Sequence, residues 1–358
     1  MSLYKLSERI FELEKQGRQM VRLNIGDPGL PTPPALVAAA QKAITEGKTR
    51  YASGQGEKKL LEALAQLHGA ETKNITVTPG SKWACYGLMK ILLQPGDNLV
   101  TPTPFWSAYE LMARNFGAKA LPLKTSAEDH WQFEPDALFE RVDAKTKLIV
   151  INSPLNPTST EYAPDSLRAV CEYAKDQKIQ VLVDEAYRDL SFKSTELTPY
   201  SEFVNVTNTF SKAYCMSGWR AGYLVASEEL SKKLVELNQI TFTNVPVFTQ
   251  AAMLAGLENR SAVTKATREE CRKRLNLAEK VFAGIKYVQP DAGFYLFLQC
   301  PGGDGAKVAE AALEKGVAVV PGANFGGYAD FLRISLSQPE AVLKPALEKV
   351  RQAIEETQ

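Results

Sequence analysis

The segment Thr209-Phe-Ser-Lys212-Ala-Tyr-Cys-Met-Ser-Gly218-Trp219-Arg220 directly follows a β-branched run over residues 204–209 that predicts a strand. Hydroxyl groups on Thr209 and Ser211 precede Lys212, and Arg220 follows eight residues later. Lysine forms Schiff bases with carbonyl groups, and hydroxyls beside an arginine fork suit a phosphate dianion. A lone lysine after a strand is most often a solvated surface residue. The flanking groups instead favour a site for a phosphorylated carbonyl compound.

The sequence on either side of this segment predicts an α/β fold. From about residue 35, helical patterns alternate with short apolar runs, which is typical of a mostly parallel sheet covered on both faces. The predicted helices cover residues 34–46, 59–68, 82–93 and 167–176, and the predicted strands cover 75–78, 98–101, 148–152, 181–184 and 204–209.

After residue 246 the pattern changes to that of a smaller α+β unit. Helices are predicted at 248–258, 262–285, 306–315 and 340–357, and strands at 294–298, 317–320 and 331–335. The first thirty residues precede the regular alternation, so we expect them to pack with this unit. The predicted division is a large domain over 31–254 and a small domain over 1–30 and 255–358.

Composition excludes several classes of protein. The chain has 358 residues with 42 basic and 41 acidic side chains, so nothing indicates a nucleic-acid or membrane-surface partner. No apolar run is long enough for a membrane span, and the N-terminus has no apolar signal core. Five scattered cysteines favour reduced thiols in the cytoplasm. The two histidines, His68 and His130, lack metal-ligand spacing; we expect no metal site and two surface positions.

An acid ends the predicted strand 181–184, in the sequence Val181-Leu-Val-Asp184-Glu-Ala-Tyr187. In doubly wound sheets, ligands bind at the carboxyl ends of the strands. A carboxylate there can hold the proton of a pyridine ring and keep the ring electron-poor, and the phenol of Tyr187 can reach the same ring. The alternative for Asp184 is a helix N-cap.

Three more strand ends carry candidate ligand groups. Asn156 lies in a loop fixed by two X-Pro steps after strand 148–152 and can donate to a ring hydroxyl, although asparagine is also a common turn residue. Gly80 and Ser81 lie at a strand-to-helix junction, where free N–H groups bind anions. Trp106 can stack on an aromatic ligand or fill the core.

Together these segments resemble the fold type I pyridoxal-phosphate enzymes, most closely the class I/II aminotransferases of the aspartate aminotransferase family. The matched pieces keep the family order over nearly the whole chain. They are Asn24-Ile-Gly26-Asp-Pro28, Tyr51 to Gly56, Gly80-Ser81-Lys82, Asn156-Pro157-Thr158, Asp184-Glu-Ala-Tyr187, Ser211-Lys212, Gly218-Trp219-Arg220, Val320 to Gly326 and Leu332-Arg333-Ile-Ser335.

The resemblance implies a role for each residue. Lys212 carries the cofactor and moves the proton, with Asp184 and Tyr187 as the other catalytic groups. Arg333 grips the substrate α-carboxylate, helped by Gly26, Trp106 and Asn156, and Tyr51 reaches the phosphate of a partner subunit, which implies a homodimer. The cofactor-binding set is Lys212, Gly80, Ser81, Lys82, Trp106, Asn156, Asp184, Tyr187, Thr209, Ser211, Arg220 and Tyr51.

Two positions depart from the family pattern. Ser159 stands where glycine is usual and could shift the loop behind Asn156. Trp83 stands where many members carry glutamine, and it either reshapes the pocket near the phosphate or packs under the helix.

The predicted activity is transfer of the amino group of an L-amino acid to a 2-oxo acid such as 2-oxoglutarate, with ping-pong kinetics. Lys82 is the candidate cation for a distal carboxylate, which favours aspartate or glutamate; a solvated Lys82 and an aromatic substrate, favoured by Trp83 and Trp106, are the alternatives. A β-lyase, an oxidase or a synthase on the same fold also remains open. A DNA-linked regulator would need an added basic module, and a dehydrogenase would need a glycine fingerprint after a strand.

Overall fold

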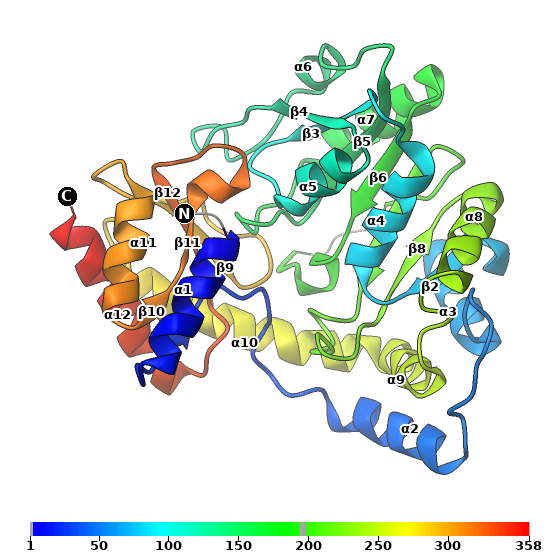
Figure 1. Cartoon of the computed structure of the whole chain (residues 1–358), viewed down its shortest axis with the longest axis horizontal. Coiled ribbons are helices and arrows are strands. Elements are labelled where there is room, and N and C mark those ends of the chain that lie inside the picture. The colour runs from blue at the N-terminus through cyan, green and yellow to red at the C-terminus, as the bar shows by residue number, and fades with distance from the viewer. Residues whose placement is uncertain (1–2, 194–197, 358) are drawn as a thin grey trace.

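The computed structural model describes residues 3–193 and 198–357, and the side chains from residue 5 onward. The chain forms a large α/β part and a smaller part beside it, which contains both termini of the described chain (Figure 1). The long helix α10 (Arg260–Val281) runs beneath both parts. The predicted fold class, an α/β large unit with a smaller α+β unit, is confirmed.

The large part is built on a seven-stranded sheet with the order β2-β8-β7-β6-β5-β3-β4. The pairs from β7 to β4 are parallel, whereas β8 runs antiparallel to both of its neighbours. The strands are β2 (Ile75–Thr78), β3 (Asn98–Pro102), β4 (Lys119–Leu123), β5 (Thr146–Asn152), β6 (Gln180–Asp184), β7 (Val204–Thr209) and β8 (Gly222–Val225).

Alternate residues of the central strands feed two separate cores, as the two-residue period of a strand requires. Leu148 and Val150 pack with residues from α4, α5 and α8, whereas Ile149 and Ile151 join the core on the opposite face with residues from α3 and α7. The helices of the large part are α2 (Pro34–Thr45), α3 (Lys58–His68), α4 (Ser81–Leu92), α5 (Ala108–Asn115), α6 (Pro135–Phe139), α7 (Pro164–Gln177), α8 (Glu228–Gln239) and α9 (Val247–Glu258), with 3₁₀ turns η1 (Thr72–Asn74) and η2 (Arg188–Leu190).

The smaller part combines a three-stranded antiparallel sheet, β11-β12-β9, with helices. The first strand of the chain, β1, pairs with β10, and Leu6, Ile10 and Leu13 of α1 share a core with Phe297. This packing supports the division into 31–254 and 1–30 with 255–358, which we keep as a proposal. The elements are α1 (Leu3–Lys15), β1 (Val21–Arg22), β9 (Tyr295–Gln299), α11 (Gly305–Glu314), β10 (Val317–Ala318), β11 (Val320–Pro321), η3 (Gly322–Phe325), β12 (Phe331–Ser335) and α12 (Glu340–Glu356).

Most predicted elements agree with the structure to within a few residues. The predicted strand over 317–320 is wrong as a single element: β10 pairs with β1 and β11 pairs with β12, so the run divides between two sheets. The sequence reading also missed β4, β8, α5, α6 and α8. β8 starts at Gly222, where an added Cβ would lie 2.7 Å from the backbone of Gly80, so close backbone packing rather than an apolar pattern defines its start.

The prediction of two surface histidines is correct for His130 and wrong for His68. His68 ends α3 as a buried residue, and its Nε2 lies 2.9 Å from the Tyr223 hydroxyl. The described residues include no group of three or more side chains arranged to hold a metal ion. None of the helices in the described part of the chain combines the length and apolar character that a bilayer span requires.

We predict that His68 makes the fold sensitive to acid. Burial, followed by the charge of Arg260, lowers the pKa of His68 to about 4 from 6.5. The stabilisation is therefore complete above pH 6.5 and is lost as the pH falls to about 4, because the unfolded chain binds the proton first. The expected loss in unfolding free energy is about 3 kcal/mol, at roughly 1.36 kcal/mol for each pKa unit.

Urea unfolding of the wild type and of His68→Gln at pH 7 and pH 4.5 measures this contribution. The variant should lose less stability than the wild type between the two pH values. His130→Gln is the matched control, because His130 is exposed, and it should behave like the wild type. Equal acid sensitivity in all three proteins would assign the effect to other groups.

Candidate active site

The candidate site forms where β5, β6 and β7 end side by side. The parallel register pairs Asn152 with Asp184 and Asp184 with Thr207. The Asn152 amide donates to the Asp184 backbone carbonyl at 2.8 Å and accepts from the Asn156 N–H at 2.9 Å. Strand β7 ends at Thr209, three residues before Lys212. The predicted groups of three separate sequence segments therefore reach one edge of the sheet.

Neutral donors surround the buried carboxylate of Asp184. The Tyr109 hydroxyl donates to Oδ2 at 2.7 Å, the Ala186 N–H donates to Oδ1 at 3.1 Å, and the Cys85 thiol lies 3.7 Å from Oδ2. Burial raises the pKa of Asp184, and these three bonds oppose the rise. Asp184 is not a helix N-cap, because Tyr187 occupies that position of η2. A buried carboxylate held by neutral donors suits a cationic ligand group.

The ammonium of Lys212 lies close to the N-terminal segment and to Tyr187. It donates to the backbone carbonyl of Gly26, and it lies 5.5 Å from the centre of the Tyr187 ring. The charge of Lys212 opposes the rise that burial causes in the pKa of Asp184, and it adds to burial and Arg220 in lowering the pKa of Lys82. Lys212 therefore lies at the centre of the charged groups of the site.

The predicted phosphate groups gather around the start of α4. Gly80 precedes this helix with φ 88°, and an added Cβ on it would lie 2.9 Å from Arg220 Nη2. The guanidinium of Arg220 donates to the backbone carbonyls of Ser217 and Pro79 at 2.7 and 3.0 Å. Free N–H groups of a helix start beside a guanidinium form an anion site.

Thr209 and Ser211 border the same helix start. The Thr209 hydroxyl donates to the Ala221 carbonyl at 2.9 Å and lies 2.9 Å from the Ser211 hydroxyl. The Ser211 N–H donates to Thr209 Oγ1 at 3.2 Å. Thr209 thus positions the turn that contains Ser211. The sequence predicted Thr209 as a phosphate ligand and did not distinguish that role from this positioning role.

Arg333, on β12 of the smaller part, is a buried cation (6% exposed). It donates from Nη1 to Asn156 Oδ1 at 2.9 Å and from Nη2 to the Asn24 carbonyl at 2.7 Å, while Nε has no partner among the described residues. No carboxylate in the described part of the chain lies within ion-pair distance of this guanidinium. The rings of Tyr295 and Phe325 lie 4.5 and 5.0 Å from it. The guanidinium of Arg333 can therefore form an ion pair with an anionic ligand.

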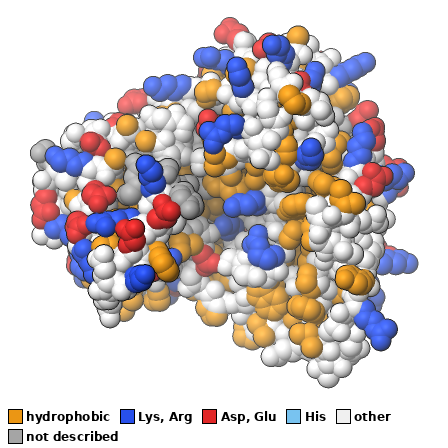
Figure 2. Space-filling model, in the orientation of Figure 1, with side chains coloured by type: hydrophobic (Ala, Val, Ile, Leu, Met, Phe, Trp, Pro, Cys, Tyr) orange, Lys and Arg blue, Asp and Glu red, His pale blue; other side chains and the backbone are white. Residues whose placement is uncertain are grey.

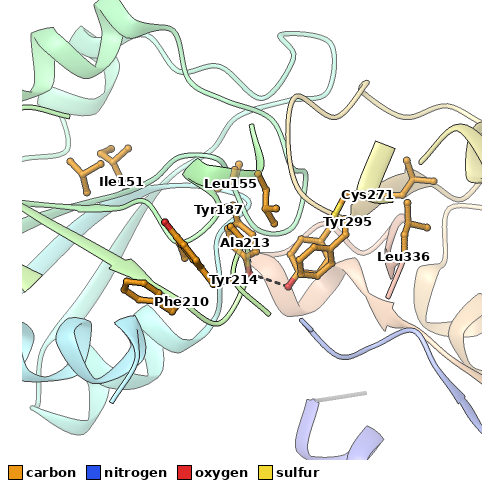
Figure 3. Packing of buried hydrophobic residues seen from close by; sticks show 14 of the residues in the cluster. Ile151, Leu155, Tyr187, Phe210, Ala213, Tyr214, Cys271, Tyr295 and Leu336 are labelled. Atoms are coloured by element: carbon orange, nitrogen blue, oxygen red, sulfur yellow. Dashed lines mark hydrogen bonds between the residues drawn. The ribbon is translucent and has the colours of Figure 1, made fainter. Parts of the chain in front are cut away.

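The phenols of Tyr187 and Tyr295 meet between the two parts of the molecule. Figure 3 shows the two rings pointing toward one another, with their hydroxyl oxygens joined at 3.0 Å. The Tyr295 hydroxyl also borders Gly26, where an added Cβ would lie only 2.3 Å from it. Glycine at position 26 therefore allows the N-terminal segment to approach this hydroxyl.

Lys82 and Trp106 are neighbours in the structure. The Lys82 ammonium lies 5.0 Å from the centre of the Trp106 ring. Partial burial, then the charges of Arg220 and Lys212, lower the pKa of Lys82. Figure 2 shows basic side chains in the hollow between the two parts, bordered by hydrophobic residues. Lys82 is an exposed side chain whose ammonium lies within the electrostatic influence of Arg220 and Lys212, so both the substrate-binding and the solvated alternatives stay open.

The two departures from the family pattern have separate explanations. Trp83 packs away from the predicted phosphate groups: its indole N–H donates to Asn238 Oδ1 at 2.9 Å, and its ring contacts Tyr86 and Phe242. Ser159 adopts the left-handed conformation that glycine usually takes, with φ 58°. Its hydroxyl accepts from the Tyr295 N–H at 3.2 Å, so the serine gains a contact that glycine lacks.

Tyr51 lies outside this cluster in the same chain. It is 89% exposed, in the loop between α2 and α3. The loop is anchored by the Ala52 N–H, which donates to Asn244, and by the Gly54 carbonyl, which accepts from Asn238. The resemblance predicts that Tyr51 contacts the phosphate bound in a partner subunit, and its exposure is compatible with that role.

Sequence reasoning missed three groups of the site: Tyr109, Cys85 and Tyr295. Tyr109 and Cys85 contact Asp184 from α5 and α4, and Tyr295 begins β9. The only sequence signals are a tyrosine three residues after Trp106 and an aromatic residue in a short apolar run. Neither is specific, because buried aromatic residues usually serve the core.

These groups fit pyridoxal phosphate, the cofactor that the sequence resemblance predicts. Asp184 is a buried carboxylate with no cationic hydrogen-bond partner among the described residues, which suits a protonated ring nitrogen. Gly80, which precedes α4, has no side chain between the helix start and Arg220, and this arrangement suits the phosphate. Lys212 supplies the amine.

Comparison with known proteins identifies the family. The family described as "Aminotransferase class I and II" matches residues 18–350. The chain is 34% identical to the aspartate aminotransferase of Thermococcus kodakarensis, over 94% of this chain and 88% of the relative. It is 32% identical to the aspartate/prephenate aminotransferase of Thermus thermophilus, over 96% of this chain and 93% of the relative.

A solved structure gives the same result. The aspartate aminotransferase from Thermus thermophilus with maleate superposes with a TM-score of 0.93 at 30% identity, over 99% of this chain and 96% of the other. The family prediction made from the sequence is thus confirmed. This chain belongs to the class I and II aminotransferases, a family of enzymes that depend on pyridoxal phosphate.

Proposed function

We propose that this aminotransferase moves the amino group of an L-amino acid, with aspartate or glutamate favoured, to a 2-oxo acid such as 2-oxoglutarate. The observation that carries this proposal is the buried guanidinium of Arg333, which no described carboxylate pairs and whose charge, like that of Asp184, acts on Tyr187. Amino acids and 2-oxo acids share the α-carboxylate that such a fork binds with two hydrogen bonds. Because both substrates would use this fork in turn, the kinetics would be ping-pong.

In the proposed reaction, Arg333 fixes the substrate carboxylate and thereby orients Cα toward Lys212. Asn156 Oδ1 holds Arg333 Nη1 at 2.9 Å, so the Nδ2 end of the same amide is the donor that remains for the cofactor's ring oxygen. Gly26 would border the substrate through its backbone. The rings around Arg333 exclude water and strengthen the charge pairing.

Pyridoxal phosphate, when bound, supplies the carbonyl that takes up the amino group and a ring that withdraws electrons from Cα. Lys212 would hold the cofactor and then move the proton at Cα. Asp184 would keep the ring nitrogen protonated, with Tyr187 donating to the ring oxygen and Trp106 lying against the ring. Gly80, Ser81, Ser211 and Arg220 would bind the phosphate, and Thr209 would hold Ser211.

Lys82 would select dicarboxylic substrates. Its ammonium lies 5.0 Å from the Trp106 ring, within the electrostatic reach of Lys212. The solved Thermus structure contains maleate, a dicarboxylate, and both curated relatives described above have aspartate in their names. A preference for aromatic substrates was predicted from Trp83 and Trp106. Trp83 no longer favours it, because its side chain packs against Asn238, Tyr86 and Phe242.

The β-lyase, oxidase and synthase alternatives have less support than transamination. They share the cofactor site, so the side chains around Lys212 do not separate them. The relatives described above are all aminotransferases.

We also propose a homodimer in which Tyr51 crosses to the partner's phosphate, and a cytoplasmic location, which suits five free thiols.

Replacement of Lys212 tests the cofactor attachment. Lys212→Ala should abolish transamination and the covalent lysine–cofactor bond that borohydride fixes in the wild type, because it removes the only amine proposed to form that bond. Mass spectrometry of the reduced, digested protein locates the bond. Lys82→Met, which leaves Lys212 intact, should still carry it. Attachment at full yield in Lys212→Ala would contradict the assignment.

Replacement of Lys82 tests substrate choice. Lys82→Met should raise KM for aspartate roughly 10- to 150-fold, since it removes one charge-assisted contact of about 1.5–3 kcal/mol. KM for alanine should change little. Lys90→Met, a change at an exposed position on the same helix, is the matched control and should leave both values unaltered. The predicted dicarboxylic preference would be wrong if phenylalanine or tyrosine were a better amino donor than aspartate and glutamate, and if Lys82→Met left KM for both kinds of donor unchanged.

Subunit mixing tests the role of Tyr51. Tyr51→Ala and Lys212→Ala proteins are each expected to have low activity. If Tyr51 serves the partner's site, then hybrids of the two variants contain one site with both wild-type residues, and mixing should restore activity. If Tyr51 acted only within its own chain, no mixed site would gain activity. Sedimentation of a fully active monomer would contradict the homodimer itself.

A further inference from the structure

We infer that Tyr295 is a positioning residue that donates a hydrogen bond to Tyr187 and thereby tunes the protonation of the bound cofactor. The inference rests on the proposed function, in which Tyr187 donates to the cofactor's ring oxygen. It concerns a residue of β9, in the smaller part of the molecule, that sequence reasoning assigned only to a strand.

The contacts of the two phenols place them in one hydrogen-bonded chain. Their hydroxyl oxygens are 3.0 Å apart, and both side chains are buried, with Tyr187 7% and Tyr295 1% exposed. Their rings meet edge to face at 5.5 Å between centres. Figure 3 shows that they come from opposite parts of the molecule and point toward one another. The contact therefore connects the cofactor side of the site to the smaller part.

The number of hydroxyl hydrogens fixes the direction of this bond. Each phenol has one hydrogen to donate. If Tyr187 gives its hydrogen to the cofactor's ring oxygen, the hydrogen between the two phenols must come from Tyr295. Burial and the neighbouring Tyr295 both raise the pKa of Tyr187 well above its ordinary range, so Tyr187 keeps its hydrogen and remains a donor.

A donor bond into the Tyr187 oxygen strengthens the bond that Tyr187 makes. Hydrogen bonds in a chain polarise one another, and this effect is larger in a buried site. A stronger bond to the cofactor's ring oxygen stabilises the deprotonated form of the bound cofactor, because that form carries more negative charge. The Tyr295 hydroxyl should therefore lower the pKa that the bound cofactor shows in its absorption spectrum.

The ring of Tyr295 has a second role, which can be separated from that of its hydroxyl. The guanidinium of Arg333 lies 4.5 Å from the ring centre, and a phenylalanine ring would provide the same face. The backbone position is fixed independently by the bond from the Tyr295 N–H to the Ser159 hydroxyl. Tyr295→Phe thus removes the hydroxyl while retaining both the Arg333 contact and the fold.

The experiment is a double-mutant cycle read by spectroscopy. The holoenzymes of the wild type, Tyr295→Phe, Tyr187→Phe and the double variant are titrated while the absorption of the bound cofactor is followed. Tyr295→Phe should raise the cofactor's pKa by about 0.5 to 1 unit, the shift expected for one neutral hydrogen bond. In the Tyr187→Phe background the same change should produce no further shift. Tyr173→Phe, a half-buried phenol stacked on Phe139 in α6, is the control and should behave like the wild type.

Other outcomes separate the inference from the function on which it rests. An unchanged pKa in Tyr295→Phe would overturn the inference, since the hydroxyl would then only fill space. An equal shift in both backgrounds would also overturn it, because Tyr295 would act on a ligand directly. If Tyr187→Phe itself left the cofactor's pKa unchanged, the proposed role of Tyr187 would be wrong, whatever Tyr295 does. In steady-state assays Tyr295→Phe should lower kcat a few-fold and leave KM for aspartate unchanged, because the Arg333 contact persists.

Discussion

The parallel hydrogen bonding of β5, β6 and β7 is the constraint on which the candidate site depends. Because the three strands run in the same direction, their carboxyl ends meet at one edge of the sheet. Asn152, Asp184 and Thr209 end these strands, and an antiparallel neighbour would place its own end at the opposite edge of the sheet. The apolar residues that precede them are buried on both faces, so the core that stabilises the sheet also fixes the register of the polar ends.

The site that results contains buried charged groups that form no ion pair with any residue the structure describes. Asp184 is held by neutral donors, and Arg333 is held by amide and carbonyl oxygens. Such groups cost stability in the absence of a ligand, and an arrangement of this kind is typical of a site built to bind ions. A protonated ring nitrogen would neutralise Asp184 in the large part, and a substrate carboxylate would neutralise Arg333 in the smaller part. Cofactor and substrate would thus each pair with one of these two buried charges.

The smaller part of the molecule contributes two side chains to the candidate site. Arg333 on β12 and Tyr295 on β9 belong to neighbouring paired strands, and Arg333 reaches Asn156 while Tyr295 reaches Tyr187 across the boundary between the parts. The Ser159 carbonyl of the large part accepts from the N–H groups of Asp291 and Ala292, just before β9, and its hydroxyl accepts from the N–H of Tyr295 at the start of β9. If Arg333 binds the substrate as proposed, these contacts would connect substrate binding to Asn156 and Tyr187 in the large part.

The sequence alone determined the fold class, the family and the identity of most candidate site residues, because these depend on local patterns. The strands Ile75–Thr78, Val204–Thr209 and Phe331–Ser335 coincide with their predictions, since β-branched and apolar runs bounded by turn residues are local signals. Lys212, Asp184 and Arg333 stand in short motifs of fixed spacing. Their proposed roles come from family order and not from any contact visible in the sequence.

Only the tertiary structure decided which side chains meet over long sequence separations. The pairing of Tyr187 with Tyr295, the donors that Tyr109 and Cys85 offer to Asp184, and the burial of His68 against Tyr223 join residues from different elements. No short motif encodes such contacts, because an aromatic residue or a cysteine in an apolar run has the same local pattern whether it fills the core or bonds a catalytic group. The division of residues 317–320 between two sheets has the same cause. The pairing is determined by β1 and β12, which are distant in the sequence, and not by the apolar run itself.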